Sequence, residues 1–179
     1  MIDIEDRIKQ KKFDEISEFN DNKYALARIE DKVGVIDFCG NVIIPFEYEA
    51  EVYEFFDTET GKYENNGYIL RDFGKISNDL YVFRKNGKEG VVNIKNETII
   101  PFEFECINLD YTELENQQLF IASKKIGYWG IINRQGETVV DFKYDPLYRE
   151  YFSNKKDYYF HAMGEQTNIF DKNGKQIIW

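Results

Sequence analysis

Histidine, cysteine, methionine and proline are all scarce in this chain of 179 residues. It contains one histidine, two cysteines, two methionines and three prolines. A single histidine, His161, excludes a histidine-based metal cluster, and Cys39 and Cys106 do not form the CxxC pair that is typical of zinc sites. We therefore expect no metal site and no cofactor, and we expect the two cysteines to be free thiols.

Long apolar runs are missing as well. The longest aliphatic runs are a few residues, far below the roughly 20 residues that a membrane-spanning helix needs. The first ten residues, MIDIEDRIKQ, carry acids and no apolar segment, unlike a secretory signal. We expect a protein of the reducing cytoplasm with no membrane partner.

Basic residues are outnumbered, 23 against 33 acids, which gives a net charge of −10. Nucleic acid and anionic membranes both favour surfaces rich in lysine and arginine, so the sequence argues against either partner. A basic protein partner is compatible with this charge. The alternative is that the charge only keeps an aromatic-rich chain soluble.

Aromatic residues are abundant, with 15 phenylalanines and 13 tyrosines. Large side chains of this kind favour strands over a helical bundle. The length corresponds to one ordinary domain with a sizeable core.

One sequence pattern recurs four times along the chain. VGVIDFCGNVIIPFEYE begins at residue 33, EGVVNIKNETIIPFEFE at 89, WGIINRQGETVVDFKYD at 129 and TNIFDKNGKQIIW at 167. The copies are spaced by 56, 40 and 38 residues. Self-similarity at such a period predicts a repeat array.

Each copy contains a four-residue turn, at residues 37–40, 93–96, 133–136 and 171–174. Its first residue is always Asp or Asn, whose side chain accepts a hydrogen bond from the backbone two residues on. Its fourth residue is always Gly or Asn, which tolerate a left-handed backbone. The turns therefore predict hairpins, with positive φ at Gly40, Asn96, Gly136 and Gly174.

The strand after each turn alternates in character. In the first copy Ile44, Phe46 and Tyr48 share one face, which we expect to be buried together with the equivalents of Phe46. Pro45 and Pro101 lack the amide donor, so they predict a bulge or a strand without a neighbour on that side. The equivalents of Phe46 are Phe102 and Phe142.

A further strand is expected before each motif, at residues 24–29, 80–85, 119–124 and 158–162. We therefore predict an all-β fold, an array of about four antiparallel three-stranded repeat units that is solenoid-like or partly closed, with a short N-terminal helix. The predicted boundaries are an N-terminal cap at 1–20, repeat 1 at 24–56, an insertion at 57–79, repeat 2 at 80–110, repeat 3 at 111–150 and a truncated repeat 4 at 151–179.

The N-terminal segment lies outside the repeats. Ile4, Ile8, Ile16 and Phe19 recur at near-helical spacing among many charges. They predict an amphipathic helix that covers the apolar face of the first unit, as the end of a repeat array requires.

The motifs resemble those of WG-repeat proteins, whose unit carries a Trp-Gly pair, a hairpin turn ending in Gly, an aliphatic stretch with Pro and an aromatic pair. The resemblance covers about residues 24–179 and is strongest from Tyr128 to Tyr144. It implies non-catalytic interaction units and assigns no catalytic residue. The chain departs from the pattern at Val33, Glu89 and Thr167, which replace tryptophan, and at Asp141, which replaces proline.

The insertion between the first two units exceeds the normal spacing by 16 to 18 residues. Turn-like clusters at Thr60-Gly61 and Asn65-Asn66-Gly67 predict extended hairpin arms or an extra strand pair. Insertions in repeat proteins often carry the binding face. The alternative is a tolerated surface insertion.

We predict a non-enzymatic protein-interaction module that binds a basic protein partner through this region, in its sharper form an inhibitor or immunity protein of a toxin. Aromatic anchors with a charged rim are typical of interfaces. A carboxylate-dependent hydrolase, or a structural fragment of a longer repeat array, remain as alternatives. The predicted contact residues are Tyr53, Glu54, Phe55, Phe56, Asp57, Glu59, Tyr63, Glu64 and Tyr68.

Overall fold

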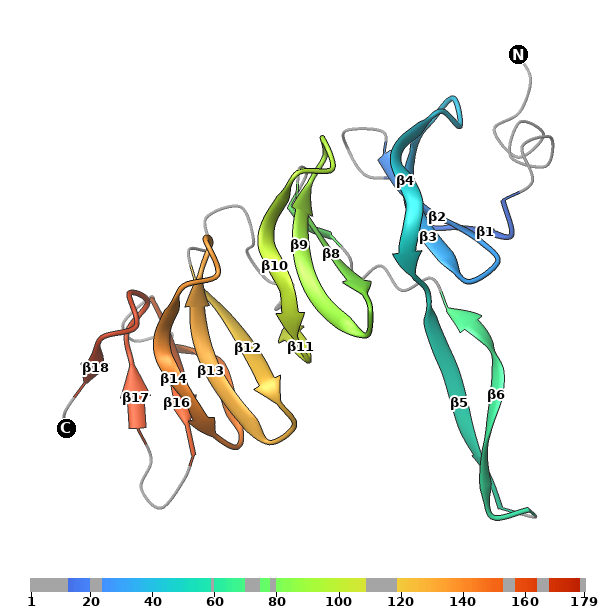
Figure 1. Ribbon diagram of the computed structural model, residues 1–179. Coiled ribbons are helices and arrows are strands. Elements are labelled where there is room, and N and C mark those ends of the chain that lie inside the picture. The colour runs from blue at the N-terminus through green and yellow to red at the C-terminus, as the bar shows by residue number, and fades with distance from the viewer. Residues whose placement is uncertain are drawn as a thin grey trace. The chain divides into compact units, whose positions relative to one another are not determined.

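Strands form all the regular secondary structure in the described part of the computed structural model (Figure 1). The structure describes residues 13–19, 24–58, 60–69, 75–77, 80–108, 119–152, 157–163 and 168–177. The chain divides into two compact units. Unit 1 comprises residues 1–86 and 93–97, and unit 2 comprises residues 87–92 and 98–179.

The strands form four antiparallel sheets and one separate hairpin. The sheets are β1 (Glu15–Ile16), β2 (Tyr24–Ile29), β3 (Lys32–Asp37) and β4 (Val42–Glu49); β7 (Lys75–Ser77), β8 (Leu80–Lys85), β9 (Lys88–Asn93) and β10 (Thr98–Phe104); β11 (Cys106–Asn108), β12 (Leu119–Lys125), β13 (Tyr128–Asn133) and β14 (Thr138–Tyr144); and β15 (Leu147–Phe152), β16 (Asp157–Ala162), β17 (Asn168–Phe170) and β18 (Gln176–Ile177). The hairpin is β5 (Glu51–Asp57) with β6 (Lys62–Ile69). The prediction of an all-β protein built from four antiparallel units is confirmed.

Each sheet has one strand more than the predicted meander. The additional strands β1, β7, β11 and β15 each pair with the first strand of the meander that follows. Two of these strands contribute a buried aliphatic residue to the core: Ile107 in β11 and Leu147 in β15. These strands escape detection from the sequence because three of the four have only two or three residues.

The predicted turns are present in all four repeats. The φ angles of Gly40, Asn96, Gly136 and Gly174 are 73°, 63°, 80° and 77°. The first residue of each turn also accepts the expected hydrogen bond from the backbone two residues on. These bonds run from Cys39 to Asp37 (2.8 Å), Lys95 to Asn93 (3.0 Å), Gln135 to Asn133 (2.9 Å) and Asn173 to Asp171 (2.9 Å).

The glycine that aligns the first three repeats has a steric cause. A Cβ added to Gly34, Gly90 or Gly130 would lie 2.6, 2.8 or 2.6 Å from a carbonyl oxygen of the next strand. Real Cβ atoms are not found this close to backbone. Because that strand carries a register shift opposite the glycine in each repeat, its backbone approaches more closely than an even ladder allows.

Pro45 and Pro101 lie where the sequence analysis expects them. Both are exposed, and they belong to β4 and β10, the edge strands of their sheets. The missing amide therefore leaves no ladder partner without a donor.

The expected burial of Phe46, Phe102 and Phe142 is wrong, although the three are equivalent. Each is half-buried, whereas the next inward-facing residues Tyr48 and Phe104 are buried. The Phe102 ring lies over the Cα of Gly90, where an added Cβ would be 2.8 Å from its Cγ. The ring therefore covers the backbone pairing of β9 and β10 near the sheet edge, and part of the ring remains exposed to solvent.

The N-terminal helix is not supported. Glu15–Ile16 is a strand that pairs with β2, and the Ser17 amide donates to the Leu26 carbonyl at 3.0 Å. Ile4 and Ile8 lie outside the described residues. The covering role is nevertheless present, because the partly buried side chains of Phe13, Ile16 and Phe19 pack on the buried core of the first sheet.

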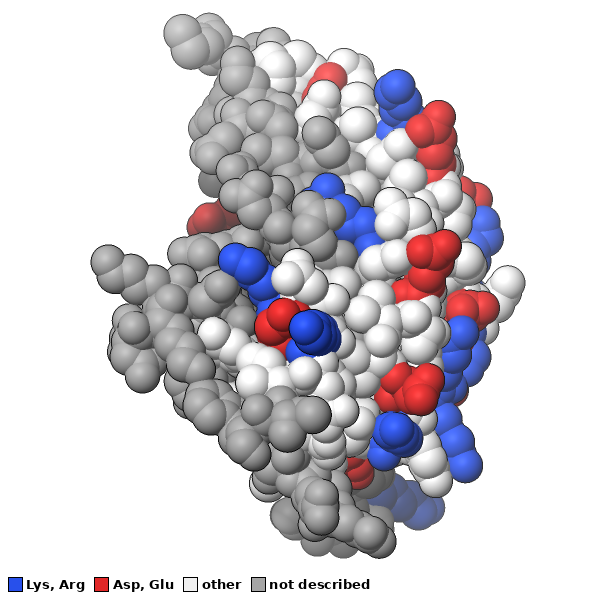
Figure 2. Space-filling view, turned by 90° about the vertical axis from the view of Figure 1, so that its left-hand side faces the viewer, with Lys and Arg blue, Asp and Glu red and all other residues white. Residues whose placement is uncertain are grey.

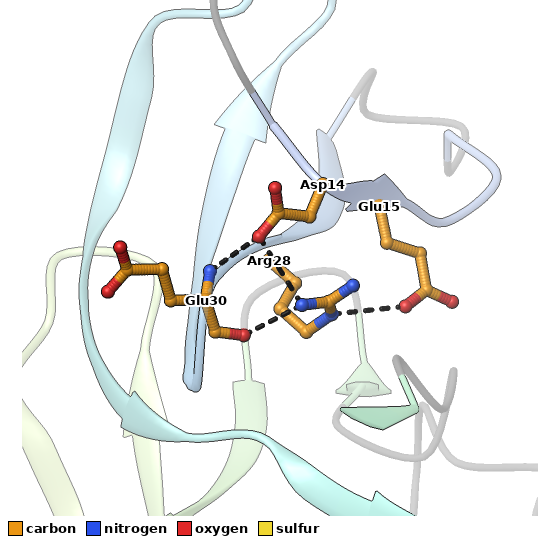
Figure 3. Close-up of polar contacts among 4 residues, drawn as sticks. All are labelled: Asp14, Glu15, Arg28 and Glu30. Atoms are coloured by element: carbon orange, nitrogen blue, oxygen red, sulfur yellow. Dashed lines mark hydrogen bonds and ion pairs between the residues drawn. The ribbon is translucent and has the colours of Figure 1, made fainter. Parts of the chain in front are cut away.

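Arg28 fastens this N-terminal strand to the sheet (Figure 3). Its guanidinium lies 3.3 Å from Glu15 and 3.4 Å from Asp14, and Nη1 donates to the Glu30 carbonyl at 2.7 Å. Asp14 also accepts the Glu30 amide at 2.6 Å. These bonds join Asp14 and Glu15 to Arg28 of β2 and to Glu30 directly after it, and they hold the segment in extended form.

Candidate functional site

The predicted contact region forms a hairpin of its own, which corresponds to the extra strand pair, one of the two predicted alternatives. It begins at Glu51, earlier than the predicted boundary at residue 57. Its backbone pairing places Phe55 opposite Glu64 and Phe56 opposite Tyr63. Tyr53, Glu54, Phe55, Phe56 and Asp57 lie on β5, Tyr63, Glu64 and Tyr68 lie on β6, and Glu59 lies outside the described residues.

The hairpin begins where later repeats continue into the next sheet. The chain runs directly from β10 into β11 and from β14 into β15, and each of these strands opens the next sheet. The equivalent position after β4 starts β5. Its residue Glu51 is exposed, whereas the aligned Ile107 and Leu147 are each 4% exposed. In β5 an exposed carboxylate therefore occupies the position at which β11 and β15 have a buried aliphatic side chain.

Among the described strands, β5 and β6 pair only with each other. Figure 1 shows the hairpin continuing from the end of β4 as a separate ribbon. Between the pairs Val52–Tyr68 and Glu54–Asn65, β5 contributes one residue and β6 contributes two. The bulge therefore lies on β6, and β5 runs evenly from Glu54 to Asp57.

The hairpin is acidic. Residues 51–69 contain five carboxylates and one lysine, a net charge of −4. Elsewhere recurrent acids have lysine partners: Glu47 with Lys85 at 3.3 Å, Glu103 with Lys124 at 2.6 Å and Glu105 with Lys88 at 2.5 Å. Figure 2 shows basic and acidic side chains interspersed over the described part of one face.

In unit 1 a polar cluster joins the first repeat to the turn of the second. The Tyr48 hydroxyl donates to Asn96 Oδ1 at 2.5 Å, and Asn96 Nδ2 donates to Glu47 Oε1 at 3.0 Å. The Asn96 hydrogen bond, followed by Lys85, lowers the pKa of Glu47. Burial, with the Glu47 charge, raises the pKa of Tyr48 to about 12. The cluster therefore keeps Glu47 charged and Tyr48 neutral.

The corresponding junction in unit 2 is apolar. The turn residue Gly136 lies against Ile100 and Pro101, which an added Cβ would meet at 3.2 and 3.3 Å. Gly174 lies in the same way against Val139. Each turn thus packs on the third strand of the repeat before it.

The described residues bring together no group of three His, Cys, Asp or Glu side chains that could hold a metal ion. His161 is half-buried and stacks on Tyr148, with ring centroids 5.3 Å apart. Cys39 and Cys106 form no disulfide bond, and both are half-buried. In the part of the chain that is described, no helix is long and apolar enough to cross a membrane.

The polar junction at Asn96 was not predicted from the sequence. A signal was present, because Asn96 is the only one of the four turn-closing residues that is not glycine. A side chain kept where glycine is favoured points to a contact made by that side chain. The replacement of Ile107 and Leu147 by Glu51 was likewise visible in the aligned repeats.

Comparison with known proteins finds a similarity for one segment of this chain. No curated protein matches the sequence. Residues 129–155, which begin in β13 and extend past β15, match the model of the family described as WG containing repeat. The predicted resemblance to WG-repeat proteins is therefore confirmed for this segment.

Proposed function

We propose that this chain is a non-enzymatic interaction module that binds a basic protein partner with the hairpin β5–β6. The observation that carries the proposal is the departure of β5 from the repeat pattern. Its counterparts β11 and β15 build the next sheet, whereas β5 pairs with β6 alone among the described strands. An element that repeat stacking does not use is available for recognition.

The composition of the hairpin suits such a partner. It carries five aromatic residues between Tyr53 and Tyr68, the residue types that most often anchor interfaces. Its net charge of −4 attracts a basic surface and accelerates encounter. The lysine partners of Glu47 and Glu103 reduce the surplus negative charge on the repeat faces, so these are weaker candidates for the same role.

A narrower form of the proposal is an inhibitor or immunity protein that covers the active site of a basic toxin or enzyme. An acidic hairpin with aromatic anchors has the chemistry needed to occupy a basic substrate cleft. This form predicts that the captured partner loses its activity in the complex.

The test is deletion of residues 51–69, which leaves residues 50 and 70–74 to connect β4 to β7. Changes in a surface loop act weakly on stability through closure entropy, so we expect the variant to fold with the thermal midpoint of the full chain. A partner is captured from a lysate of the source cells with the full chain, purified and titrated against both proteins. We expect the partner to be basic and its affinity to fall at least about tenfold when the hairpin is deleted. The remaining affinity should depend less on salt concentration.

A double variant, Glu18→Lys with Asp141→Lys, is the matched charge control. Both residues are exposed and lie outside the hairpin. We expect it to retain most of the affinity although its net charge is less negative. Equal affinity of the full chain and the folded deletion variant contradicts the proposal.

A further inference from the structure

We infer that β5 receives an extended basic segment of the partner as an added strand, which converts the hairpin into a three-stranded sheet. This inference rests on the proposed function and specifies how the hairpin recognises its partner. Strand addition uses backbone hydrogen bonds for affinity and side chains for selection.

The first support is the second edge of β5, which pairs with no strand in the described part of the chain. A two-stranded hairpin is marginally stable in water, and a third strand adds a second ladder. The repeat sheets protect comparable edges, since β4 carries Pro45 and β10 carries Pro101. Residues 51–57 contain no proline, so every residue of β5 retains its backbone donor.

The second support is the difference between the two strands of the hairpin. The extra residue near Asn66 and Gly67 makes β6 uneven, and a bulge weakens further pairing along a strand edge. From Glu54 to Asp57, β5 pairs with β6 without a register shift. An incoming strand therefore meets a regular backbone on the β5 side.

The chemistry of the occupant follows from the charges of β5. Glu51, Glu54 and Asp57 place three carboxylates on a strand of seven residues that has no lysine or arginine. Opposite charges on neighbouring strands stabilise pairing, and like charges oppose it. A second copy of this chain would bring the same acids to the edge, so self-pairing is disfavoured. A lysine- or arginine-bearing strand is the complementary occupant.

The test uses the full chain and three synthetic peptides in fluorescence polarisation. The first alternates lysine with valine, the second is the same peptide with alternate backbone amides methylated, and the third replaces lysine by glutamate. We expect the first to bind at least about tenfold more tightly than the second, because methylation removes ladder donors at unchanged charge. The glutamate peptide should not bind measurably.

Hydrogen exchange of the bound full chain locates the peptide. We expect slower exchange of the outward-pointing amides of β5 and little change in the four repeat sheets. The charge-reversed variant Glu54→Lys with Asp57→Lys should lose the basic peptide. The matched control Glu18→Lys with Asp141→Lys should keep it.

Equal binding of the methylated and unmethylated basic peptides overturns strand addition, as does protection confined to other strands or no binding of any peptide. Each of these results leaves the proposed function standing if deletion of residues 51–69 still abolishes capture of a basic partner. If deletion has no effect on capture, the proposed function fails independently of the peptide results.

Discussion

The repeat junctions of the two units solve one packing problem with opposite chemistry. In unit 1 the turn residue Asn96 forms hydrogen bonds with Tyr48 and Glu47 of the preceding repeat. In unit 2 the aligned Gly136 has no side chain and lies against Ile100 and Pro101. The φ angles are nonetheless similar, 63° and 80°. The repeat therefore constrains the backbone of the turn and leaves the contact chemistry free to vary.

The aligned aromatic residues Tyr48 in β4 and Phe104 in β10 differ in the same way. Tyr48 is 2% exposed and stacks on Phe83 with ring centroids 4.3 Å apart. Its equivalent Phe104 is fully buried and lies tilted against Phe142 at 6.1 Å. Of these two residues only Tyr48 carries a hydroxyl, and that hydroxyl donates to Asn96, the only asparagine among the four turn-closing residues. Tyr48 and Asn96 thus form a polar pair in unit 1, whereas the junction at Gly136 in unit 2 is an apolar contact.

Truncation of the apolar junction should have the largest effect. Phe104→Ala removes a fully buried ring, and we expect a loss of about 3–5 kcal/mol in the free energy of unfolding from transfer and cavity terms. Phe102→Ala is the control, because the half-buried ring should contribute only about 1–2 kcal/mol. Chemical denaturation of both variants checks the order. Equal losses of stability in the two variants would show that Phe102 contributes to the core as much as Phe104 does.

The glycine of the unit 2 junction should come next. Gly136→Val places a branched side chain at a φ of 80°, beside Ile100 and Pro101, and we expect a loss of about 2–3 kcal/mol. Gly61→Val is the matched control, since its φ is 66° but nothing lies within 4 Å of the added Cβ. The difference between the two losses measures the junction contact alone. Identical losses would mean that only backbone strain operates.

The polar junction should respond less, and in a pH-dependent way. Tyr48→Phe removes the hydroxyl donor to Asn96, for which we expect a loss of about 1 kcal/mol at neutral pH. Folding raises the pKa of Tyr48 from 10.0 to about 12, mainly through burial. The native state thus retains a proton that the unfolded chain releases, and stability falls as pH rises from about 10 to 12.

Denaturation curves at several alkaline pH values test this contribution. The full chain should lose stability through that window, and Tyr48→Phe should lose less because its ring does not titrate. Phe104→Tyr in unit 2 is the reciprocal variant and introduces a buried hydroxyl without an aligned asparagine. If the free energy of unfolding falls equally with pH in the full chain and in Tyr48→Phe, Tyr48 is excluded as the titrating group.

The comparison also shows which features of the fold could be read from the sequence. The turns were predictable because local chemistry determines them: an Asp or Asn oxygen, and a residue that accepts a left-handed φ. The strand edges at Pro45 and Pro101 were predictable for the same reason. These signals depend on a few neighbouring residues and are therefore independent of tertiary packing.

Features that depend on neighbours distant in sequence were not predictable. Near-helical spacing at Ile16 and Phe19 suggested a helix, but pairing with β2 and the Arg28 contacts favour an extended segment. The partial exposure of Phe102 depends on its place near a sheet edge, which periodicity does not report. The sequence indicated that the hairpin exists. The start of its first strand becomes visible only when Glu51 is aligned with Ile107 and Leu147 of the later repeats.

The smallest effect should come from the lysines that cross both junctions. Lys85 pairs with Glu47 in unit 1 and Lys124 with Glu103 in unit 2, and all four side chains are 41–48% exposed. Each ammonium also lies over an aromatic ring, 5.6 Å from the Tyr48 centroid and 5.2 Å from that of Phe104. Exposed ion pairs contribute about 0–1 kcal/mol, so Lys85→Met and Lys124→Met should each lose less than about 1 kcal/mol.

Acid titration separates these two lysine variants. The pKa of Glu47 is lowered first by Asn96 and only then by Lys85, so Lys85→Met should preserve most of that shift. A lowered pKa stabilises the native state above the unfolded value of 4.5, and this stability is lost as pH falls through the folded value. NMR titration of Glu47 in Lys85→Met should therefore still give a lowered pKa, whereas Asn96→Gly should raise it towards 4.5. If Lys85→Met alone restores the ordinary pKa, the ion pair rather than the turn asparagine stabilises the charge at this junction, and the contrast between the two units is smaller than the hydrogen bonds indicate.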